Sequence, residues 1–217
     1  MDRGRCGWWL GCVLAIAFAA RIAAAFAIDA RVPPGETDLI AGDASGYWDL
    51  ASDLAEGRKY AIYTPPRQVL RMPGFPALLA VSFLAFGKSP IAARLLLAVI
   101  GALGCYLVFV LGRRLFDDRT ALIGAAITAV TPTFVAFSPL FLSETVFAVT
   151  LVASLIPAAS LLKGFADPKT PSSDLICHAT TCGALIGLAC YMRPSWLLWA
   201  PFVAFCAILA GLSLIHI

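Results

Sequence analysis

Long uninterrupted apolar runs are the feature that most limits how this 217-residue chain can fold. Hydrophobic residues make up 60% of the chain and charged residues 13%, whereas an average soluble domain has about 25% charged residues. A helix of roughly 20 apolar residues spans the hydrocarbon core of a bilayer. The runs therefore predict an all-α, polytopic transmembrane helical bundle with about six spans: Trp8–Ile28, Pro90–Gly112, Ala121–Phe137, Thr145–Leu162, Cys177–Met192 and Trp196–Leu214.

Basic residues predict the orientation of these spans, because short loops rich in Lys and Arg stay in the cytoplasm. Arg3 and Arg5 precede the first run, and three arginines lie in the loop 113–119. Both signals place the N-terminus in the cytoplasm. The apolar segment Gly74–Phe86 is too short to span and is expected to lie at the membrane interface. The sequence thus predicts a multi-pass integral membrane protein whose first outer loop, residues 29–89, faces the extracytoplasmic side.

Both ends of the chain leave room for a second interpretation. Ala25-Phe26-Ala27 has the small-x-small form of a signal-peptide cleavage site. The length of the first run and the presence of Arg21 within it favour a retained anchor instead. The last apolar run continues to Ile217 without a polar anchor. We therefore expect residues 1–217 to be part of a transmembrane domain whose C-terminal portion is missing.

One polar insert, with its core at Gly42–Pro76, interrupts the apolar chain. Seven of the thirteen carboxylates lie between Asp29 and Glu56. Apolar residues recur there at helical spacing and predict an amphipathic helix on the membrane surface, ended by Gly57. Asp43 is expected at the N-cap of this helix, and capping alone, worth about 1 kcal/mol, would explain it.

Several kinds of site have no signature in this sequence. The seven cysteines are absent from the polar insert and are interpreted as small hydrophobic residues. The two histidines, His178 and His216, are isolated, and neither a CxxC motif nor a DxD motif is present. We therefore expect no cofactor and no metal. The sequence does not exclude a divalent ion. The absence of a basic stripe argues against a nucleic-acid partner.

Loose motifs occur in a consistent order relative to the predicted spans: Gly42-Asp43 with Tyr47–Ala51, Arg71–Pro76, Leu111–Phe116, Ser138–Glu144 and Arg193-Pro194. In this order they resemble the membrane glycosyltransferases of the GT-C superfamily. They are most similar to glycosyltransferase family 39, which includes protein O-mannosyltransferases and the lipid A aminoarabinose transferase. The likeness covers nearly all of the chain, and family members are considerably longer.

The resemblance implies a reaction and its partners. Family members transfer a glycosyl unit from a polyprenyl-phosphate sugar to an acceptor at the non-cytoplasmic membrane face, with inversion. The expected partners are this donor, membrane lipid and an acceptor that is a protein, lipid or glycan. The expected setting is the bacterial inner membrane, in glycosylation of proteins or of the cell envelope.

The resemblance also implies roles for two carboxylates. Asp43 takes the position of the base that receives the proton of the acceptor hydroxyl. Tyr47, one helical turn further along, is expected to contact substrate. Glu144 is the second acidic group, although an acid in the first turn of a helix is also favoured by the helix dipole. Asp49 and Asp53 compete for the role of base but fall on the solvated face of the predicted helix.

Four arginines are candidates for binding the lipid phosphate. Arg71 occupies the family's basic position before a proline-rich turn, and its guanidinium suits bidentate phosphate binding. Met72 stands where many members have the first of two prolines, so the local turn need not match that of the family. Arg67, Arg94 and Arg193 are the further candidates, and solvation or headgroup contact is the alternative for each.

Two arginines keep open interpretations. Arg193 is followed by Trp196 and Trp199, and an interfacial anchor with an aromatic belt would explain all three residues. Arg21 lies within the first run, where a charge is costly, and the sequence assigns it no role.

Two other functions compete with the transferase. A lipid-linked sugar flippase or a transporter would place its functional charges near the bilayer midplane. The carboxylates here cluster in an outer loop, which favours the enzyme. A membrane scaffold without chemistry would leave the polar insert without a role.

Overall fold

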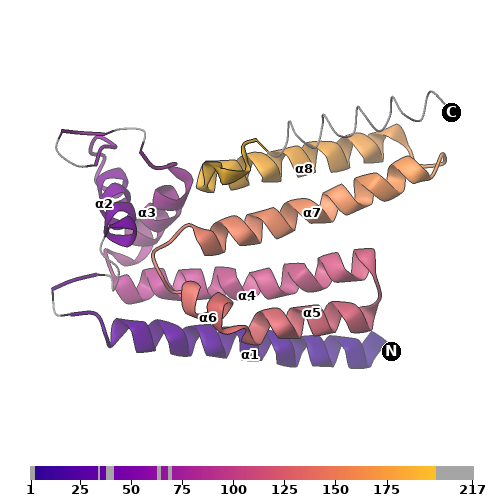
Figure 1. The fold of residues 1–217 in the computed structure, drawn as a ribbon, viewed down its shortest axis with the longest axis horizontal. Helices are drawn as coiled ribbons and strands as arrows, with labels where there is room; N and C mark the ends of the chain where they lie inside the picture. Colours follow the sequence, from indigo (N-terminus) through magenta and orange to yellow (C-terminus); the bar gives the residue numbers. More distant parts are fainter. Residues whose placement is uncertain (1–2, 34, 38–41, 63–64, 68–69, 199–217) are drawn as a thin grey trace.

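The computed structural model describes residues 3–33, 35–37, 42–62, 65–67 and 70–198. Within these ranges the chain is helical, as predicted, with connecting loops and one isolated pair of bridged residues. The helices, shown in Figure 1, are α1 (Arg3–Asp29), α2 (Asp43–Ala55), α3 (Gly74–Phe86), α4 (Pro90–Leu115), α5 (Asp118–Val130), α6 (Pro132–Phe137), α7 (Glu144–Ala166), α8 (Ser172–Met192) and the short 3-10 turn η1 (Pro194–Trp196).

The long helices lie side by side, and α4 is central among them (Figure 1). It contacts α1, α5 and α7, while α7 pairs with α8. Among the described residues, α1, α4, α7 and α8 are long and apolar enough to cross a membrane. These four helices confirm four of the predicted spans. The predicted span Trp196–Leu214 lies almost entirely outside the described residues.

The predicted span Ala121–Phe137 is not one helix but two, and proline explains the correction. α5 ends at Val130, and α6 begins at Pro132. A proline lacks the N–H that would continue the helix and disfavours helical geometry in the residue before it. Thr131 accordingly has a ψ of 119°, outside the helical range.

A buried arginine satisfies the carbonyl groups that this break leaves open. Arg21 on α1 donates to the carbonyl oxygens of Thr128 (3.2 Å) and Ala129 (3.2 Å), and its Nε donates to Ser138 Oγ (3.1 Å). An unbroken helix would bond the Thr128 carbonyl to the N–H of residue 132, which is Pro132. The side chain is 1% exposed. Arg21, unassigned from sequence, thus fastens α1 to the break between α5 and α6.

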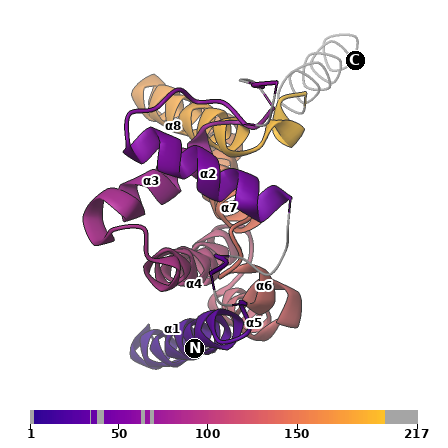
Figure 2. The ribbon, with the colours of Figure 1, turned by 90° about the vertical axis from the view of Figure 1, so that its left-hand side faces the viewer.

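The polar insert folds over one end of the bundle, which we call the α2–α3 end. Figures 1 and 2 show α2 and α3 lying across this end, while the described N-terminus lies at the opposite end. Their shared core is aromatic: the Trp48 ring lies 4.4 Å from Phe83 and 5.0 Å from Phe141, measured between centroids. The two short helices are therefore anchored to each other and to the loop that precedes α7.

The start of α2 differs from the prediction in one respect. Gly42, not Asp43, is the N-cap residue, and its φ of 102° is a conformation that glycine adopts without strain. Ser45 Oγ accepts the Gly42 N–H at 3.1 Å. Asp43 is the first residue of the helix and does not occupy the N-cap position. The Asp43 carboxylate is consequently available for a contact outside its own helix.

Candidate functional site

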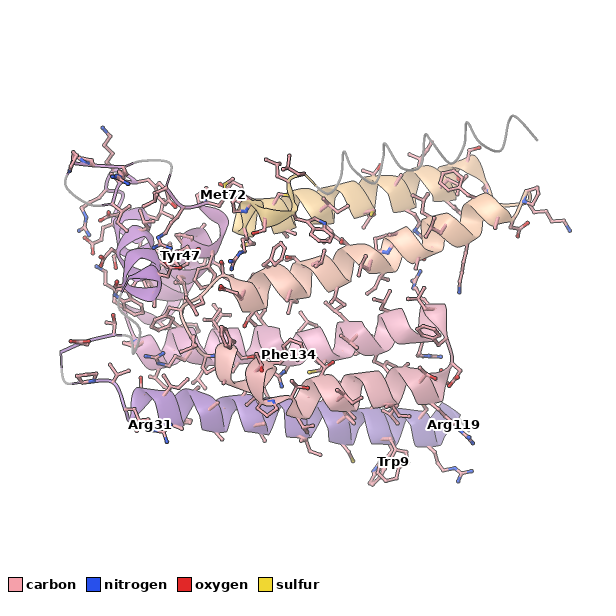
Figure 3. All side chains as sticks on the ribbon, viewed as in Figure 1. Trp9, Arg31, Tyr47, Met72, Arg119 and Phe134 are labelled. Atoms are coloured by element: carbon pink, nitrogen blue, oxygen red, sulfur yellow. The ribbon has the colours of Figure 1, made fainter. Side chains whose placement is uncertain are left out.

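The α2–α3 end brings together residues from four parts of the chain. Asp43 and Tyr47 come from α2, Arg71 from the segment before α3, Glu144 from the first turn of α7 and Arg193 from the residue after α8. Figure 3 shows Tyr47 and Met72 at this same end of the bundle. Five of the seven predicted site residues therefore share one region, although they are far apart in sequence.

Arg71 and Asp43 form the first of two ion pairs. Arg71 Nη2 lies 2.8 Å from Asp43 Oδ1 and 3.4 Å from the Gly42 carbonyl oxygen. The guanidinium carbon also lies 4.6 Å from the centroid of the Tyr47 ring, a cation–π arrangement. The Arg71 side chain is 11% exposed and that of Asp43 is 69% exposed. The pair thus joins a well-packed cation to a carboxylate at the surface.

A glycine makes room for this arginine. A Cβ added at Gly46 would lie 2.8 Å from Ile62 Cδ1 and 3.1 Å from Arg71 Nε. Both distances are shorter than ordinary van der Waals contacts. The absence of a side chain at position 46 therefore lets the guanidinium lie directly against α2.

Backbone contacts hold the segment that carries Arg71. The Tyr60 hydroxyl donates to the Arg71 carbonyl oxygen at 3.0 Å. Burial is the main cause that raises the pKa of Tyr60 to about 12, so this hydroxyl keeps its proton at neutral pH. Ile62 and Arg67 exchange two backbone hydrogen bonds, of 3.1 and 2.8 Å. Arg67 itself is exposed, and it pairs with Ile62 through backbone atoms.

Glu144 and Arg193 form the second ion pair. Arg193 Nη1 lies 2.5 Å from Glu144 Oε1, and Arg193 Nε donates to Ser195 Oγ at 3.1 Å. The hydrogen bond to Glu144 raises the pKa of Arg193, although partial burial opposes the shift. The contact thus favours the charged form of Arg193.

A hydroxyl contact links the two ion pairs. Tyr47 Oη lies 3.2 Å from Ser143 Oγ, and Ser143 directly precedes Glu144. The Ser143 residue is 1% exposed. Ser143 and Tyr60 were not predicted as site residues. For Ser143 a signal existed, because it lies within the Ser138–Glu144 motif, whereas nothing local distinguishes Tyr60.

Arg94 lies outside this cluster and is engaged by protein groups. Its guanidinium contacts Asp29 Oδ1 (3.4 Å) and the carbonyl oxygens of Pro139 (3.2 Å) and Thr37 (2.7 Å), and it lies 4.5 Å from the Phe141 ring centroid. Arg94 is 1% exposed. Phosphate binding by Arg94 stays a prediction. The protein oxygens around its guanidinium and its burial do not favour it. Its evident contribution is to hold the loop that leads into α7.

The competing carboxylates of α2 belong to a second group of charges. Asp53 accepts from Arg58 Nε at 2.8 Å, and Glu56 pairs with Lys88 and Arg58. Partial burial raises the pKa of Asp49, and the charge of Asp53 raises it further while Lys88 opposes it. These contacts involve the last two turns of α2, beyond the turn that carries Asp43.

An apolar cavity of about 340 Å³ adjoins Glu144. Residues of α1, α4, α5, α6 and α7 line it, among them Arg21, Gly104, Phe134 and Val149. Figure 3 marks Phe134 on α6, about midway along the bundle. The cavity thus connects the charged end with the apolar interior.

Metal ligands are not gathered in the described part of the chain. No group of three or more His, Cys, Asp or Glu side chains there lies close enough to hold an ion. The two carboxylates of the site are each paired with an arginine instead.

The fold and the site define a helical membrane protein with paired carboxylates and arginines at one end of the bundle. Residues 69–215 match the family described as dolichyl-phosphate-mannose-protein mannosyltransferase, which is more than half of the chain. The chain belongs to this family, and it is therefore a GT-C membrane glycosyltransferase that uses a lipid-linked sugar. No curated protein and no solved structure matches it. The matched residues include Arg71, Glu144 and Arg193 but begin after Asp43 and Tyr47.

Proposed function

We propose that this protein transfers a glycosyl unit from a polyprenyl-phosphate sugar to an acceptor hydroxyl, with inversion, at the α2–α3 end. The observation that carries the proposal is the 2.8 Å contact between Arg71 and Asp43. It brings a cation suited to a leaving phosphate beside a carboxylate suited to receive a proton. The α2–α3 end is assigned to the non-cytoplasmic face, because Arg113 and Arg114 lie at the opposite end of the bundle.

In the proposed reaction, the oxygen of the acceptor hydroxyl attacks the anomeric carbon, and Asp43 takes the proton of that hydroxyl. The bond between that carbon and the phosphate oxygen breaks. Polyprenyl phosphate leaves, and Arg71 stabilises its negative charge. Attack opposite the leaving group inverts the anomeric configuration. No covalent intermediate on the protein is required.

This geometry requires one rearrangement within the site. Inverting attack places the base and the leaving phosphate on opposite sides of the sugar, whereas Asp43 and Arg71 are in direct contact. The donor phosphate must therefore replace Asp43 on the guanidinium. Asp43 is the more exposed partner and the easier one to turn away. Donor binding thus releases the base for the acceptor hydroxyl.

The second ion pair is assigned a supporting role. Arg193 supplies a further positive charge beside the phosphate position, and Glu144 orients it through their 2.5 Å contact. Tyr47 supports Arg71 through its ring and Ser143 through its hydroxyl. With two arginines to neutralise the phosphate, the proposed transfer needs no metal.

The apolar cavity beside Glu144 suits the hydrocarbon part of the donor. Its lining is mainly apolar and its volume is about 340 Å³, so it could take some of the isoprenoid units but not the whole chain. The proposed donor would place its phosphate among the arginines and its first isoprenoid units in this cavity.

The decisive experiment substitutes Asp43→Asn, with Asp49→Asn as the matched control on the same helix. Membranes carrying each variant receive labelled polyprenyl-phosphate sugar in the presence of EDTA, and label is followed into protein, lipid and glycan fractions. We expect a loss of roughly 10²–10⁴-fold for Asp43→Asn, typical for removal of a general base, and little change for the control. Unchanged transfer by Asp43→Asn at equal expression would exclude it as the base.

The same assay separates the transferase from the flippase alternative. A transferase releases polyprenyl phosphate as label moves to the acceptor. Movement of intact donor across the membrane, without release of polyprenyl phosphate, would support the flippase and contradict the proposed function.

A further inference from the structure

A second group of basic side chains lies at the opposite end of the bundle, where α4 and α7 end side by side. Arg114 in the last turn of α4 donates through Nη1 to Ser160 Oγ on α7. Lys163 in the last turn of α7 donates through Nζ to the Arg114 carbonyl oxygen. Each cation thus reaches across to the other helix. We call Val110, Arg113, Arg114, Ser160 and Lys163 the α4–α7 notch.

Carboxylates balance only part of the positive charge of the notch in the part of the chain that the structure describes. Among the described residues, no carboxylate pairs with Arg114 or Lys163, whereas Arg113 is 2.6 Å from Asp118. The C-terminal carbonyls of two helices attract cations, but this attraction is modest, about 0.3–1 kcal/mol. A guanidinium has five N–H donors and an ammonium has three, so the contacts described leave most of them for another acceptor.

The acidic residues near the notch are engaged elsewhere. Asp117 caps α5 by accepting the N–H groups of Arg119 (2.7 Å) and Thr120 (3.0 Å), and these hydrogen bonds lower its pKa. Asp167 accepts the Lys169 N–H at 3.0 Å in the turn after α7. Within the described ranges, neither carboxylate forms an ion pair with Arg114 or Lys163.

The surroundings of the notch are apolar and hollowed. Val110, Arg113 and Arg114 line a cavity of about 290 Å³. On α7, Leu162 is 72% exposed and Phe165 is 68% exposed. Cations beside exposed apolar side chains at the end of a spanning helix match a phospholipid, whose phosphate and acyl chains lie at these two levels.

We propose that the α4–α7 notch binds the phosphate headgroup of an anionic phospholipid. The phosphate lies between Arg114 and Lys163, and an acyl chain follows Leu162 toward the apolar part of α7. The bound lipid neutralises two adjacent like charges and joins α4 to α7. This site is independent of the proposed sugar transfer, because it lies at the other end of the bundle.

The test measures lipid retention by the purified full chain. Native mass spectrometry compares phosphatidylglycerol with phosphatidylcholine of the same acyl chains, for the unmodified chain, the double variant Arg114→Ala/Lys163→Ala and the control Arg119→Ala. Arg119 is exposed and lies at the same end (Figure 3). A basic residue near an anionic lipid contributes roughly fivefold in affinity, so we expect the double variant to lose roughly thirtyfold and the control to change little. Equal retention of both lipids by the unmodified chain would overturn the proposal.

Two further measurements test the lipid preference even if the double variant folds poorly. The charge-retaining variant Arg114→Lys/Lys163→Arg should keep its preference for phosphatidylglycerol, and added NaCl should weaken that preference in the unmodified chain. Inorganic phosphate and glycerol 1-phosphate identify the source of the anion. If millimolar amounts of either displace the lipid, the notch is a general anion site and the lipid proposal fails.

Discussion

The guanidinium of Arg71 and the carboxylate of Asp43 lie 2.8 Å apart, so each neutralises the charge of the other. Twenty-eight positions separate them in sequence. In the proposed reaction this contact would couple two events. A donor phosphate that occupied Arg71 would free Asp43, so donor binding would be a condition for activating the acceptor.

Replacing Arg71 should weaken donor binding. A hydrogen bond to a charged group contributes about 1.5–3 kcal/mol, so Arg71→Ala should lower donor affinity by roughly 10- to 100-fold. The measurement is binding of labelled polyprenyl-phosphate sugar to purified protein. Lys59→Ala is the matched control, because that basic side chain is exposed and also lies between α2 and α3. Equal donor affinity in the Arg71→Ala and unmodified proteins would contradict the assignment.

Gly46→Ala should disturb the site without removing a charge. The added methyl group would lie 3.1 Å from Arg71 Nε and 2.8 Å from Ile62 Cδ1, so the guanidinium must shift. Both neighbours are side-chain atoms, so the cost in stability should be small while donor affinity falls. Gly183→Ala is the control, since nothing lies within 4 Å of a Cβ built there. A Gly46→Ala protein with normal donor affinity would show that the position of Arg71 is not critical.

Glu144 and Arg193 should act as a unit. Their side chains are 41% and 39% exposed, so the pair should contribute less than about 1 kcal/mol to the free energy of unfolding. Its effect on sugar transfer should be larger, and the losses from Glu144→Gln and Arg193→Gln should not add in the double variant. A double-mutant cycle on the transfer rate measures this coupling. Strictly additive losses would mean that the two side chains act separately.

Arg21→Met should destabilise the fold. The substitution leaves the Thr128 and Ala129 carbonyls without their side-chain donor inside the bundle. An unsatisfied buried polar group costs about 1–3 kcal/mol. Thermal unfolding in detergent should therefore shift to clearly lower temperature, and Arg31→Ala, at an exposed position, should leave it nearly unchanged. An Arg21→Met protein as stable as the unmodified chain would show that these contacts carry little energy.

Local patterns predicted most of the helices. Apolar runs located α1, α4, α7 and α8, and helical spacing located α2, because both signals depend on neighbours in sequence. The break at Pro132 was missed, because the span Ala121–Phe137 was predicted from its apolar run alone. The cap at Gly42 was missed because Asp43 is itself a common N-cap residue, and only the backbone conformation distinguishes the two.

The contacts between side chains could not be predicted from local patterns. The buried arginines illustrate this best: Arg21 received no role from sequence, and Arg94 was one of several candidates for phosphate binding, yet both donate to protein oxygens. Their partners come from other helices and loops, and no local pattern records which helix lies beside which. The same holds for Ser143, whose contact with Tyr47 depends on how α7 meets α2.

By itself the sequence determined that the chain is a helical membrane protein, where its polar insert lies and which family it resembles. The first two properties follow from composition and short-range periodicity, which bilayer and backbone physics translate directly into helices, whereas the resemblance rests on the order of short motifs. Only the tertiary structure decided that Asp43 contacts Arg71 and that Glu144 contacts Arg193. Those contacts depend on the packing of separate helices, which places distant side chains within hydrogen-bond distance and so defines the site.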